Sequence, residues 1–395
     1  MTGSTLAYIG PDRQLHTVRT DGSQPTQLTL SLAGNPLLRW GKPDVTPTAY
    51  SWPTWSPDGQ RLACFSHGAD PDTQEPASVH VVEVDGLREY QLGSFPGSMP
   101  LYAAWQPDGQ GVAVLTQDGT GLELMYGRLD QLGRMRAMDQ GSPLFFTWGP
   151  GGRRLFIHTG PSRPGSDGRL MVRDALGQLP DEALPQAPGN YCSPVIVGGR
   201  LVHVERLGLV NRLISTELSG QDPQIMMEFD GLAAVVAAPA LGGVIFSTAS
   251  DAQGAPYRGT TLVPLDGSPT VRLCDDDCLA FHWSEAGRQL LYVRVDPDSR
   301  LLAWHSVRPG EVPVERVRFW PTQEMRFALH FFEQFVSTHR FVSGDGQHLL
   351  FCGHPEDQLP DRGPPGIHVL DLRRDGPPRL LAQGSFACFA PSDGV

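Results

Sequence analysis

The residues of this sequence that could bind a ligand gather around position 335. Glu333, His339 and Arg340 lie close together along the chain, and His282 lies upstream of them. A carboxylate, an imidazole and a guanidinium can together bind an anion or a small polar molecule. Arg340 has apolar neighbours, and an unpaired buried charge costs several kcal/mol. We therefore expect Arg340 either to bind an anion or to form an ion pair with a carboxylate of another structural element.

An aromatic stretch precedes His339 and Arg340. Its large apolar residues are Phe327, Leu329, Phe331, Phe332 and Phe335. Thr322 can cap a helix there, with Met325, Leu329 and Phe332 on one face, so we predict a helical insertion over 322–336. Such a segment could hook a partner, plug a channel, or fold onto the protein as extra core. Phe331, Phe332 and Phe335 are the candidate partner-binding residues.

Acidic residues are the candidate metal ligands. Asp275, Asp276 and Asp277 stand between Cys274 and Cys278, and carboxylate oxygens are the ligands that Ca²⁺ and Mg²⁺ prefer. We expect them on a loop, where a solvated acidic rim is the alternative. No second Cys/His pair with zinc-ligand spacing lies near the two cysteines. The sequence therefore predicts no metal and no cofactor, and it leaves open whether the two cysteines form a disulfide.

No catalytic motif accompanies these residues. The sequence contains no H-E-x-x-H, no G-x-S-x-G and no glycine-rich phosphate loop. The Asp-Gly pairs at 58, 85, 108, 266 and 393 indicate hairpin turns rather than catalytic aspartates. His80 and His368 occupy matching places beside apolar neighbours, which indicates repeat architecture rather than metal ligation. The sequence thus favours a non-catalytic protein and leaves an enzyme as the alternative.

The elements that position these residues must be short. The chain has 395 residues, of which 45 are Gly and 36 are Pro, and both residue types disfavour long helices. Disorder is excluded because 40% of the residues are hydrophobic and eight are Trp. Short strands joined by tight turns remain.

A corner motif repeats along the chain at intervals of 43 to 59 residues. Its clearest copies are Trp55-Ser-Pro-Asp-Gly59, Trp105-Gln-Pro-Asp-Gly109, Trp148-Gly-Pro-Gly-Gly152 and Trp283-Ser-Glu-Ala-Gly287. Weaker copies end at Gly199, Gly243, Gly346 and Gly394. Each copy predicts a strand, a tight turn and a buried strand, and a second pair of strands follows it.

Four antiparallel strands per repeat predict an all-β fold, a β-propeller. The count favours eight four-stranded blades, with seven as the alternative because the copies at Gly199 and Gly243 lack Trp, Pro and Asp. The chain ends after the first strand of a blade and begins with a second strand at Leu6–Ile9. We therefore expect both termini to close one blade, within a single propeller domain over 1–395.

The innermost strand of each propeller blade lines the central channel. Among the three residues that precede each repeat's Trp position, only His282, His339 and Arg340 are Asp, Glu, Lys, Arg or His. With Glu333 they define a candidate ligand site at the mouth of the channel.

The Trp55–Leu62 corner, W-S-P-D-G-x-x-L, resembles the PD40 repeat of TolB-like propellers, a WD40-like class that includes the propeller domains of prolyl oligopeptidase-type peptidases. The resemblance spans essentially the whole chain and implies a fold rather than an activity. Those peptidases carry an α/β-hydrolase domain with a G-x-S-x-G elbow, which this sequence lacks, so we expect no peptidase activity. TolB is exported and has an extra N-terminal domain, and neither feature is visible here.

The net charge of the chain limits the classes of partner that we expect. The formal net charge is −12, which opposes nucleic acids and anionic membranes, and no apolar stretch is long enough to span a bilayer. Without a visible signal peptide, we expect a cytoplasmic protein. Three hypotheses follow: a scaffold that binds a protein or peptide, a small-molecule sensor or lyase/hydrolase-type enzyme with its site in the channel mouth, and an accessory subunit of a membrane complex.

Overall fold

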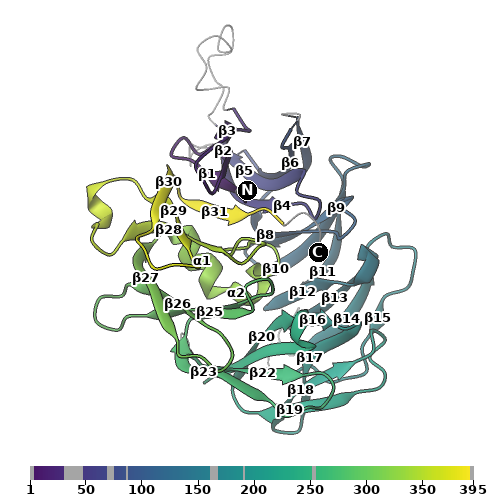
Figure 1. The fold of residues 1–395 in the computed structure, drawn as a ribbon. Coiled ribbons are helices and arrows are strands. Elements are labelled where there is room, and N and C mark those ends of the chain that lie inside the picture. Colours follow the sequence, from purple (N-terminus) through teal and green to yellow (C-terminus); the bar gives the residue numbers. More distant parts are fainter. Residues whose placement is uncertain are drawn as a thin grey trace. The chain divides into compact units, whose positions relative to one another are not determined.

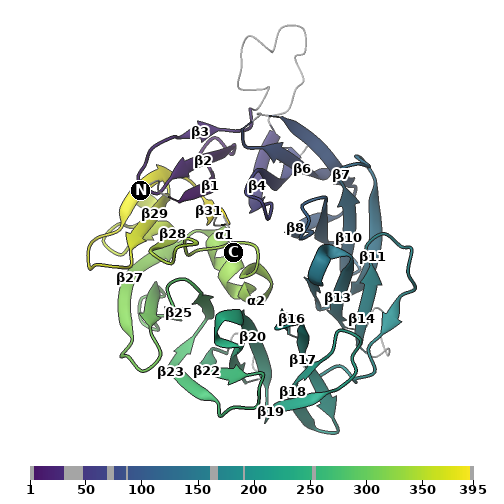
Figure 2. The same cartoon turned by 45° about the vertical axis from the view of Figure 1, so that its right-hand side comes forward.

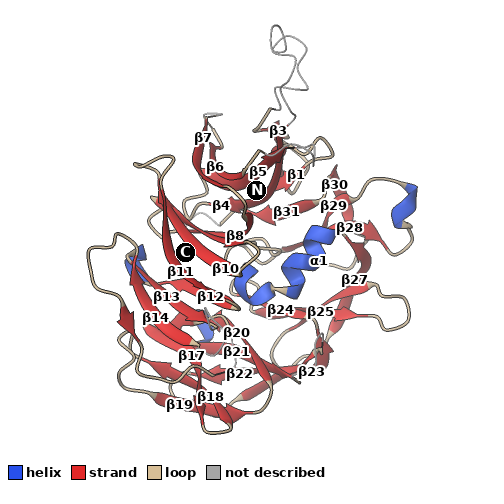
Figure 3. Cartoon of the chain, turned by 180° about the vertical axis from the view of Figure 1, so that it is seen from behind, coloured by secondary structure: helices blue, strands red, loops and turns tan. Residues whose placement is uncertain are grey.

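The computed structural model describes residues 4–30, 48–68, 75–85, 88–160, 168–189, 192–250 and 255–391. Short strands dominate this part of the chain, and the helices α1 (Gln323–His330) and α2 (Phe332–Phe335) follow each other closely (Figure 3). In the described ranges, three short 3-10 helices lie in connections: Pro150–Gly152, Pro239–Leu241 and Pro360–Arg362. Among the described residues, no helix is long and apolar enough to cross a membrane.

The chain forms two compact units. Unit 1 contains Met1–Asp139, Phe319–Phe327 and Thr338–Val395, and unit 2 contains Gln140–Arg318 and Ala328–Ser337. The chain therefore passes from one unit to the other within α1 and again after Ser337. The helical insertion supplies residues to both units.

Unit 1 contains four blades, numbered here from the N-terminus. Blade 1 consists of β31 (Phe386–Phe389), β1 (Thr5–Ile9), β2 (Leu15–Arg19) and β3 (Thr26–Gln27). Blade 2 consists of β4 (Thr48–Trp55), β5 (Arg61–Gly68), β6 (Ala77–Glu83) and β7 (Glu89–Phe95). Blade 3 consists of β8 (Met99–Trp105), β9 (Gly111–Gln117), β10 (Leu122–Arg128) and β11 (Met135–Gly141).

Blade 8, also in unit 1, departs from this pattern at its inner strand. It contains β28 (His348–Pro355), β29 (Gly366–Asp371) and β30 (Arg379–Gln383). The inner edge of β28 pairs with the isolated bridge residue Val342 and with the last three residues of β27 (Val314–Pro321).

Unit 2 contains the other four blades. Blade 4 consists of β12 (Leu144–Trp148), β13 (Arg154–Thr159), β14 (Arg169–Asp174) and β15 (Glu182–Ala183). Blade 5 consists of β16 (Val195–Val197), β17 (Arg200–Leu207), β18 (Val210–Thr216) and β19 (Gln224–Phe229). Blade 6 consists of β20 (Leu232–Ala238), β21 (Gly243–Ala249), β22 (Tyr257–Pro264) and β23 (Val271–Cys278). Blade 7 consists of β24 (Ala280–Ser284), β25 (Gln289–Val295), β26 (Leu302–Val307) and β27.

These antiparallel sheets confirm the predicted fold class, a β-propeller, and the described residues form eight blades. The predicted closure is also present. β1 pairs with β31 in the register Leu6 to Phe389 and Ile9 to Phe386, so the purple and yellow ends of the chain share one sheet (Figure 1). This pairing covers the edge that each terminal strand would otherwise expose. The last turn, Asp393-Gly394, lies outside the described residues.

The corner motif folds the same way in a clear and in a weak copy. In the clear copy, Arg61 N donates to Ser56 Oγ at 2.9 Å and Gln60 N donates to Asp58 Oδ1 at 3.1 Å. In the weak copy that ends at Gly346, His348 N donates to Ser343 Oγ at 2.9 Å and Gln347 N donates to Asp345 Oδ1 at 3.0 Å. Gly59 and Gly346 have φ of 67° and 68°, a conformation that glycine adopts without steric cost. The Ser-x-Asp pair and the glycine therefore build the turn.

The corner tryptophans join neighbouring blades in unit 1. Trp55 Nε1 donates to the carbonyl of Cys388 at 3.2 Å, and Trp105 Nε1 donates to the carbonyl of Thr54 at 2.9 Å. Each indole thus reaches the inner strand of the preceding blade. The apolar core follows the same plan, because Trp55 and Leu62 of blade 2 pack in one buried cluster with Cys388 of blade 1.

Candidate functional site

The insertion begins with the predicted cap. Met325 N donates to Thr322 Oγ1 at 3.1 Å, which satisfies one of the free amide groups at the start of α1. Met325, Ala328 and Leu329 are fully buried. The spacing of these apolar residues sets the buried face of the helix.

In unit 2, α2 packs on the inner strands. The ring of Phe332 lies 4.9 Å from that of Phe281 in β24 and 5.5 Å from that of Tyr257 in β22. The side-chain amide of Gln334 forms two hydrogen bonds with the backbone of Phe146, as a neighbouring strand would. Its Oε1 accepts from Phe146 N at 3.2 Å, and its Nε2 donates to Phe146 O at 3.1 Å. Figure 2 shows α2 beside β20. α2 thus contacts several blades of this unit.

Glu333 lies between Phe332 and Gln334 in the sequence of α2. Its Oε2 accepts from Ser193 N at 3.1 Å, and its Oε1 accepts from the Tyr257 hydroxyl at 3.1 Å. Its residue surface is partly exposed, but its carboxyl group is surrounded by protein. Burial raises the pKa of Glu333 to about 8, and the two hydrogen bonds offset only part of that effect. The carboxyl group is therefore largely protonated at neutral pH.

Groups around Glu333 are affected by the same burial. The pKa of the Cys192 thiol is raised well above its ordinary value, first by burial and then by the charge of Glu333. The pKa of Tyr257 is raised for the same reasons. A thiol held protonated in this way is a poor nucleophile.

His282 is part of the apolar packing in unit 2. It lies in β24, is almost fully buried, and its ring lies 5.6 Å from that of Trp304 and 6.3 Å from that of Phe332. Burial lowers its pKa to about 3, so the imidazole is neutral at physiological pH.

His339 occupies a comparable position in unit 1. It is fully buried, its Nε2 lies 3.2 Å from Thr54 Oγ1, and its Nδ1 lies 2.8 Å from Thr338 Oγ1. The Thr338 hydroxyl also donates to the Tyr102 hydroxyl at 3.1 Å. Burial lowers the pKa of His339 to about 3. Both ring nitrogens therefore have hydroxyl partners, and the imidazole is neutral.

Trp52 covers His339 from the inner strand of blade 2. Its ring lies 4.8 Å from that of Phe386 and 5.5 Å from that of Phe327 in α1. Its φ is 53°, which is uncommon for a bulky residue. The strand register shifts between Ser51 and Thr54, so a bulge turns this indole onto the aromatic cluster.

Arg340 differs from its neighbour His339. Its backbone carbonyl accepts from Phe389 N at 2.9 Å, and its residue surface is exposed. Burial of part of the side chain lowers the pKa of the guanidinium. Within the described ranges, no carboxylate lies within ion-pair distance of it. The expected ion pair between Arg340 and a carboxylate of another blade is therefore not found among the described residues.

The three candidate partner-binding phenylalanines separate in the structure. Phe332 and Phe335 are buried, so their rings are not available to a partner. Phe331 is 43% exposed, and its ring lies edge-on to that of His330 at 4.7 Å. The insertion is thus mainly extra core, with one exposed aromatic residue where α1 ends.

The acidic run lies in a strand, not on the expected loop. Asp275, Asp276 and Asp277 are part of β23. Arg272 Nε lies 2.7 Å from Asp275 Oδ1, and the Tyr292 hydroxyl donates to Asp276. Within the described residues, no group of three or more His, Cys, Asp or Glu side chains is arranged to hold a metal ion. Cys274 and Cys278 are free thiols, and both are buried.

Sequence reasoning missed the residues that complete these clusters. Tyr257, Ser193 and Gln334 surround or accompany Glu333, and Thr54 and Trp52 cover His339. Trp52 occupies one of the inner-strand positions that the repeat alignment defines, which is a signal that could have identified it. The partners of Glu333 carry no comparable signal.

Comparisons with known proteins concern the fold. No family model and no curated protein sequence matches this chain. Solved structures similar to it include TolB from Acinetobacter baumannii, with 16% identity over 69% of this chain and 64% of that chain and a TM-score of 0.38. An oligogalacturonate lyase from Vibrio parahaemolyticus has 12% identity over 97% of this chain and 85% of that chain, with a TM-score of 0.49.

A third similar structure is the β-propeller domain of the Trilobed protease from Pyrococcus furiosus. It has 10% identity over 80% of this chain and 95% of that chain, with a TM-score of 0.48. The chain spans less than two thirds of the TolB chain that it matches. At these identities the likeness is one of fold alone.

Proposed function

We propose that this protein is a non-catalytic β-propeller that binds a protein or peptide partner. One observation carries the proposal: packing occupies Glu333 and His339, two of the candidate ligand-binding residues, and leaves Phe331 exposed. Glu333 accepts hydrogen bonds on both carboxyl oxygens, and His339 has a hydroxyl partner at each ring nitrogen. Groups that are held neutral and hydrogen-bonded in this way serve the fold.

Phe331 supports a binding role because exposed aromatic residues dominate the energetics of protein interfaces. Its backbone is held by its neighbours, since Phe332, Gln334 and Phe335 are buried in unit 2. Binding through a residue whose backbone is already held in place costs less conformational entropy than ordering a free loop.

Photo-crosslinking tests this proposal. The photoreactive residue p-benzoylphenylalanine is placed at position 331 and, as the matched control, at Leu209, which is 88% exposed in the same unit. We expect a defined adduct from position 331 in cells of the source organism, identified by mass spectrometry, and none of the same identity from position 209. Identical adducts from both positions, or none from position 331, would contradict the proposal.

A cytoplasmic location is part of this proposal and has a separate test. Fractionation of the source cells is expected to recover the chain with soluble cytoplasmic enzymes. Recovery with the periplasmic or extracellular fraction would remove this part and leave the binding role to be judged by the crosslinking result.

Arg340 supports a second candidate function, the binding of a small anion. Its guanidinium is partly desolvated and has no carboxylate partner within the described residues, and a guanidinium binds carboxylates and phosphates through paired hydrogen bonds. Calorimetric titration with citrate and with inorganic phosphate tests it. Saturable binding that Arg340→Gln removes would favour this candidate, and binding unchanged in that variant would exclude it.

A further inference from the structure

A hollow in unit 1 lies where the two ends of the propeller sequence meet. Its volume is about 540 Å³, within the size range of small-molecule sites. Tyr8, Asp12 and His16 line it from the β1–β2 hairpin of blade 1, and Ala382 and Gln383 line it from the end of β30. Of the described residues that line it, none is an arginine or a lysine.

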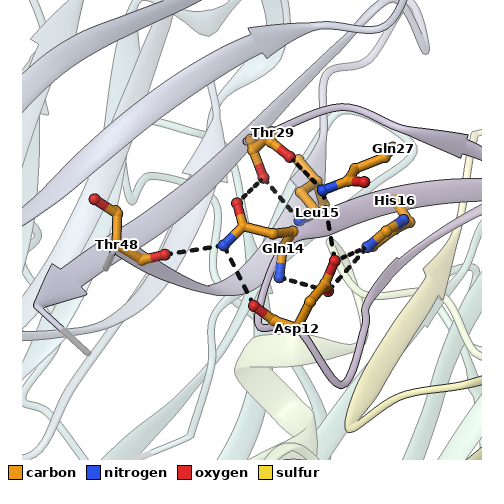
Figure 4. Close-up of polar contacts among 7 residues, drawn as sticks. All are labelled: Asp12, Gln14, Leu15, His16, Gln27, Thr29 and Thr48. Carbon is orange, nitrogen blue, oxygen red and sulfur yellow. Dashed lines mark hydrogen bonds and ion pairs between the residues drawn. The ribbon is translucent and has the colours of Figure 1, made fainter. Parts of the chain in front are cut away.

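Asp12 and His16 form a pair in the wall of this hollow (Figure 4). His16 Nε2 lies 3.0 Å and 3.1 Å from the two carboxylate oxygens of Asp12. The imidazole stacks on the ring of Tyr8, with centroids 5.1 Å apart and planes 21° apart. The side chain of Asp12 is 44% exposed, against 16% for His16. The carboxylate is therefore the more accessible charge of the pair.

Gly10 leaves the space that this pair occupies. A Cβ atom at position 10 would lie 2.7 Å from Asp12 Oδ1 and 2.9 Å from His16 Nε2. Both distances are shorter than real Cβ contacts, so any side chain there would displace the carboxylate or the imidazole. The glycine is required by the pair rather than by its own backbone angle.

A buried polar network holds Asp12 from behind (Figure 4). Gln14 N donates to Asp12 Oδ1 at 3.0 Å, and Gln14 Nε2 donates to Thr48 O at 2.9 Å. Thr29 Oγ1 donates to Gln14 Oε1 at 3.1 Å, and Leu15 N donates to Thr29 Oγ1 at 2.9 Å. Gln14 and Thr29 are almost fully buried. Such support fixes a ligand-binding group in one orientation.

Two other blades show which part of this arrangement is architectural. Tyr292 stacks on His305 between β25 and β26, and Phe351 stacks on His368 between β28 and β29, the strands that correspond to β1 and β2. The ring centroids are 5.1 Å and 4.7 Å apart. The stacked ring and histidine are therefore a repeated packing device. In blade 7 the carboxylate near His305 is Glu315, at 3.6 Å and on a separate strand. In blade 1 the carboxylate is that of Asp12, which lies in the β1–β2 hairpin itself and next to Gly10.

We propose that the hollow binds a primary alkylammonium group, such as that of a small amine or a lysine side chain, with Asp12 as its counter-charge. A carboxylate offers about four acceptor positions, and three donors surround that of Asp12: Gln14 N at 3.0 Å, His16 Nε2 at 3.0 Å and 3.1 Å from the two oxygens, and Gln27 Nε2 at 3.5 Å. At least one position remains for an ammonium donor, and the carbonyl group of the exposed Gln383 side chain offers another acceptor. No arginine or lysine is among the described residues that line the hollow, and this and the net charge of −12 both favour a cationic ligand.

Calorimetric titration of the full chain with n-butylammonium chloride tests the proposal, with 1-butanol as the uncharged match and guanidinium chloride at the same ionic strength as the alternative cation. We expect saturable binding of butylammonium and none of butanol. Asp12→Asn is expected to weaken binding about tenfold or more, because it removes a charge-assisted hydrogen bond. Gly10→Ala is expected to weaken it comparably by displacing the pair.

Glu315→Gln is the matched control, since it changes the carboxylate beside the stacked histidine of blade 7 and should leave butylammonium binding unchanged. Thermal melting of each variant shows whether it folds. Equal binding of butylammonium and butanol, no saturation by butylammonium, or full binding in a folded Asp12→Asn variant would each overturn the proposal. Saturation by guanidinium alone would also overturn it.

Discussion

Glu333 in unit 2 and His339 in unit 1 are both held neutral by burial, but with opposite consequences. Burial raises the pKa of Glu333 to about 8 and lowers that of His339 to about 3. A neutral imidazole is the ordinary form near pH 7, whereas a neutral carboxylic acid is not. Glu333 therefore carries a proton at neutral pH that the unfolded chain would release, and His339 does not. The same physical effect makes one residue a source of pH dependence near neutrality and the other a stable part of the core.

The largest effect is expected from removing the aromatic ring beside Glu333. Phe332→Ala should lower the free energy of unfolding by about 3–5 kcal/mol, because a buried phenylalanine leaves a cavity. Urea unfolding followed by tryptophan fluorescence measures this. Phe331→Ala is the control and should cost less than about 1 kcal/mol, since Phe331 is exposed. Equal losses in the two variants would show that α2 is not packed as described.

The next largest effect is the contribution of Glu333 to the pH dependence of the unfolding free energy. Its folded pKa lies above its unfolded value, so the folded state binds the extra proton and stability from this group falls as pH rises from about 4.5 to about 8. Glu333→Gln should remove about one proton from the unfolding linkage in that window. The measurement is the free energy of unfolding at several pH values. An unchanged slope in the variant would mean that the carboxyl group ionises normally.

For His339 we expect the unfolding free energy to change with pH in the opposite direction. Its folded pKa lies below its unfolded value, so stability from this group falls as pH drops from about 6.5 toward 3. His339→Gln should reduce the acid-side slope by about one proton and leave the slope between pH 7 and 8 unchanged. Acid titration of the unfolding free energy measures it. A change confined to pH 7 to 8 would contradict the neutral, hydroxyl-bonded imidazole.

The smallest effect is expected at Arg340. Arg340→Gln should change the free energy of unfolding by less than about 0.5 kcal/mol, because the exposed residue has no ion pair to lose within the described residues. Thermal unfolding in buffer without anions other than chloride checks this. A large loss would show that the guanidinium supports the fold and would weaken its use as an anion site.

Local signals in the sequence predicted much of the fold. The Trp-x-Pro-Asp-Gly corners, the alternation of strands and the Thr322 cap depend on contacts between residues a few positions apart, such as Ser56 with Arg61 and Thr322 with Met325. Closure by the termini followed from counting strands. These features were predictable because turn and capping chemistry act within a few residues.

The sites depend on contacts between distant residues. Glu333 could be named from the sequence, but Ser193 and Tyr257 lie 140 and 76 positions away from it, and Gln334 binds Phe146 across 188 positions. Nothing in local spacing distinguishes Phe331, which is exposed, from Phe332, which is buried. The sequence alone determined a β-propeller of repeated corners. Only tertiary packing decided which of its titratable residues are buried and neutral, and that the Asp12 carboxylate lines an open hollow.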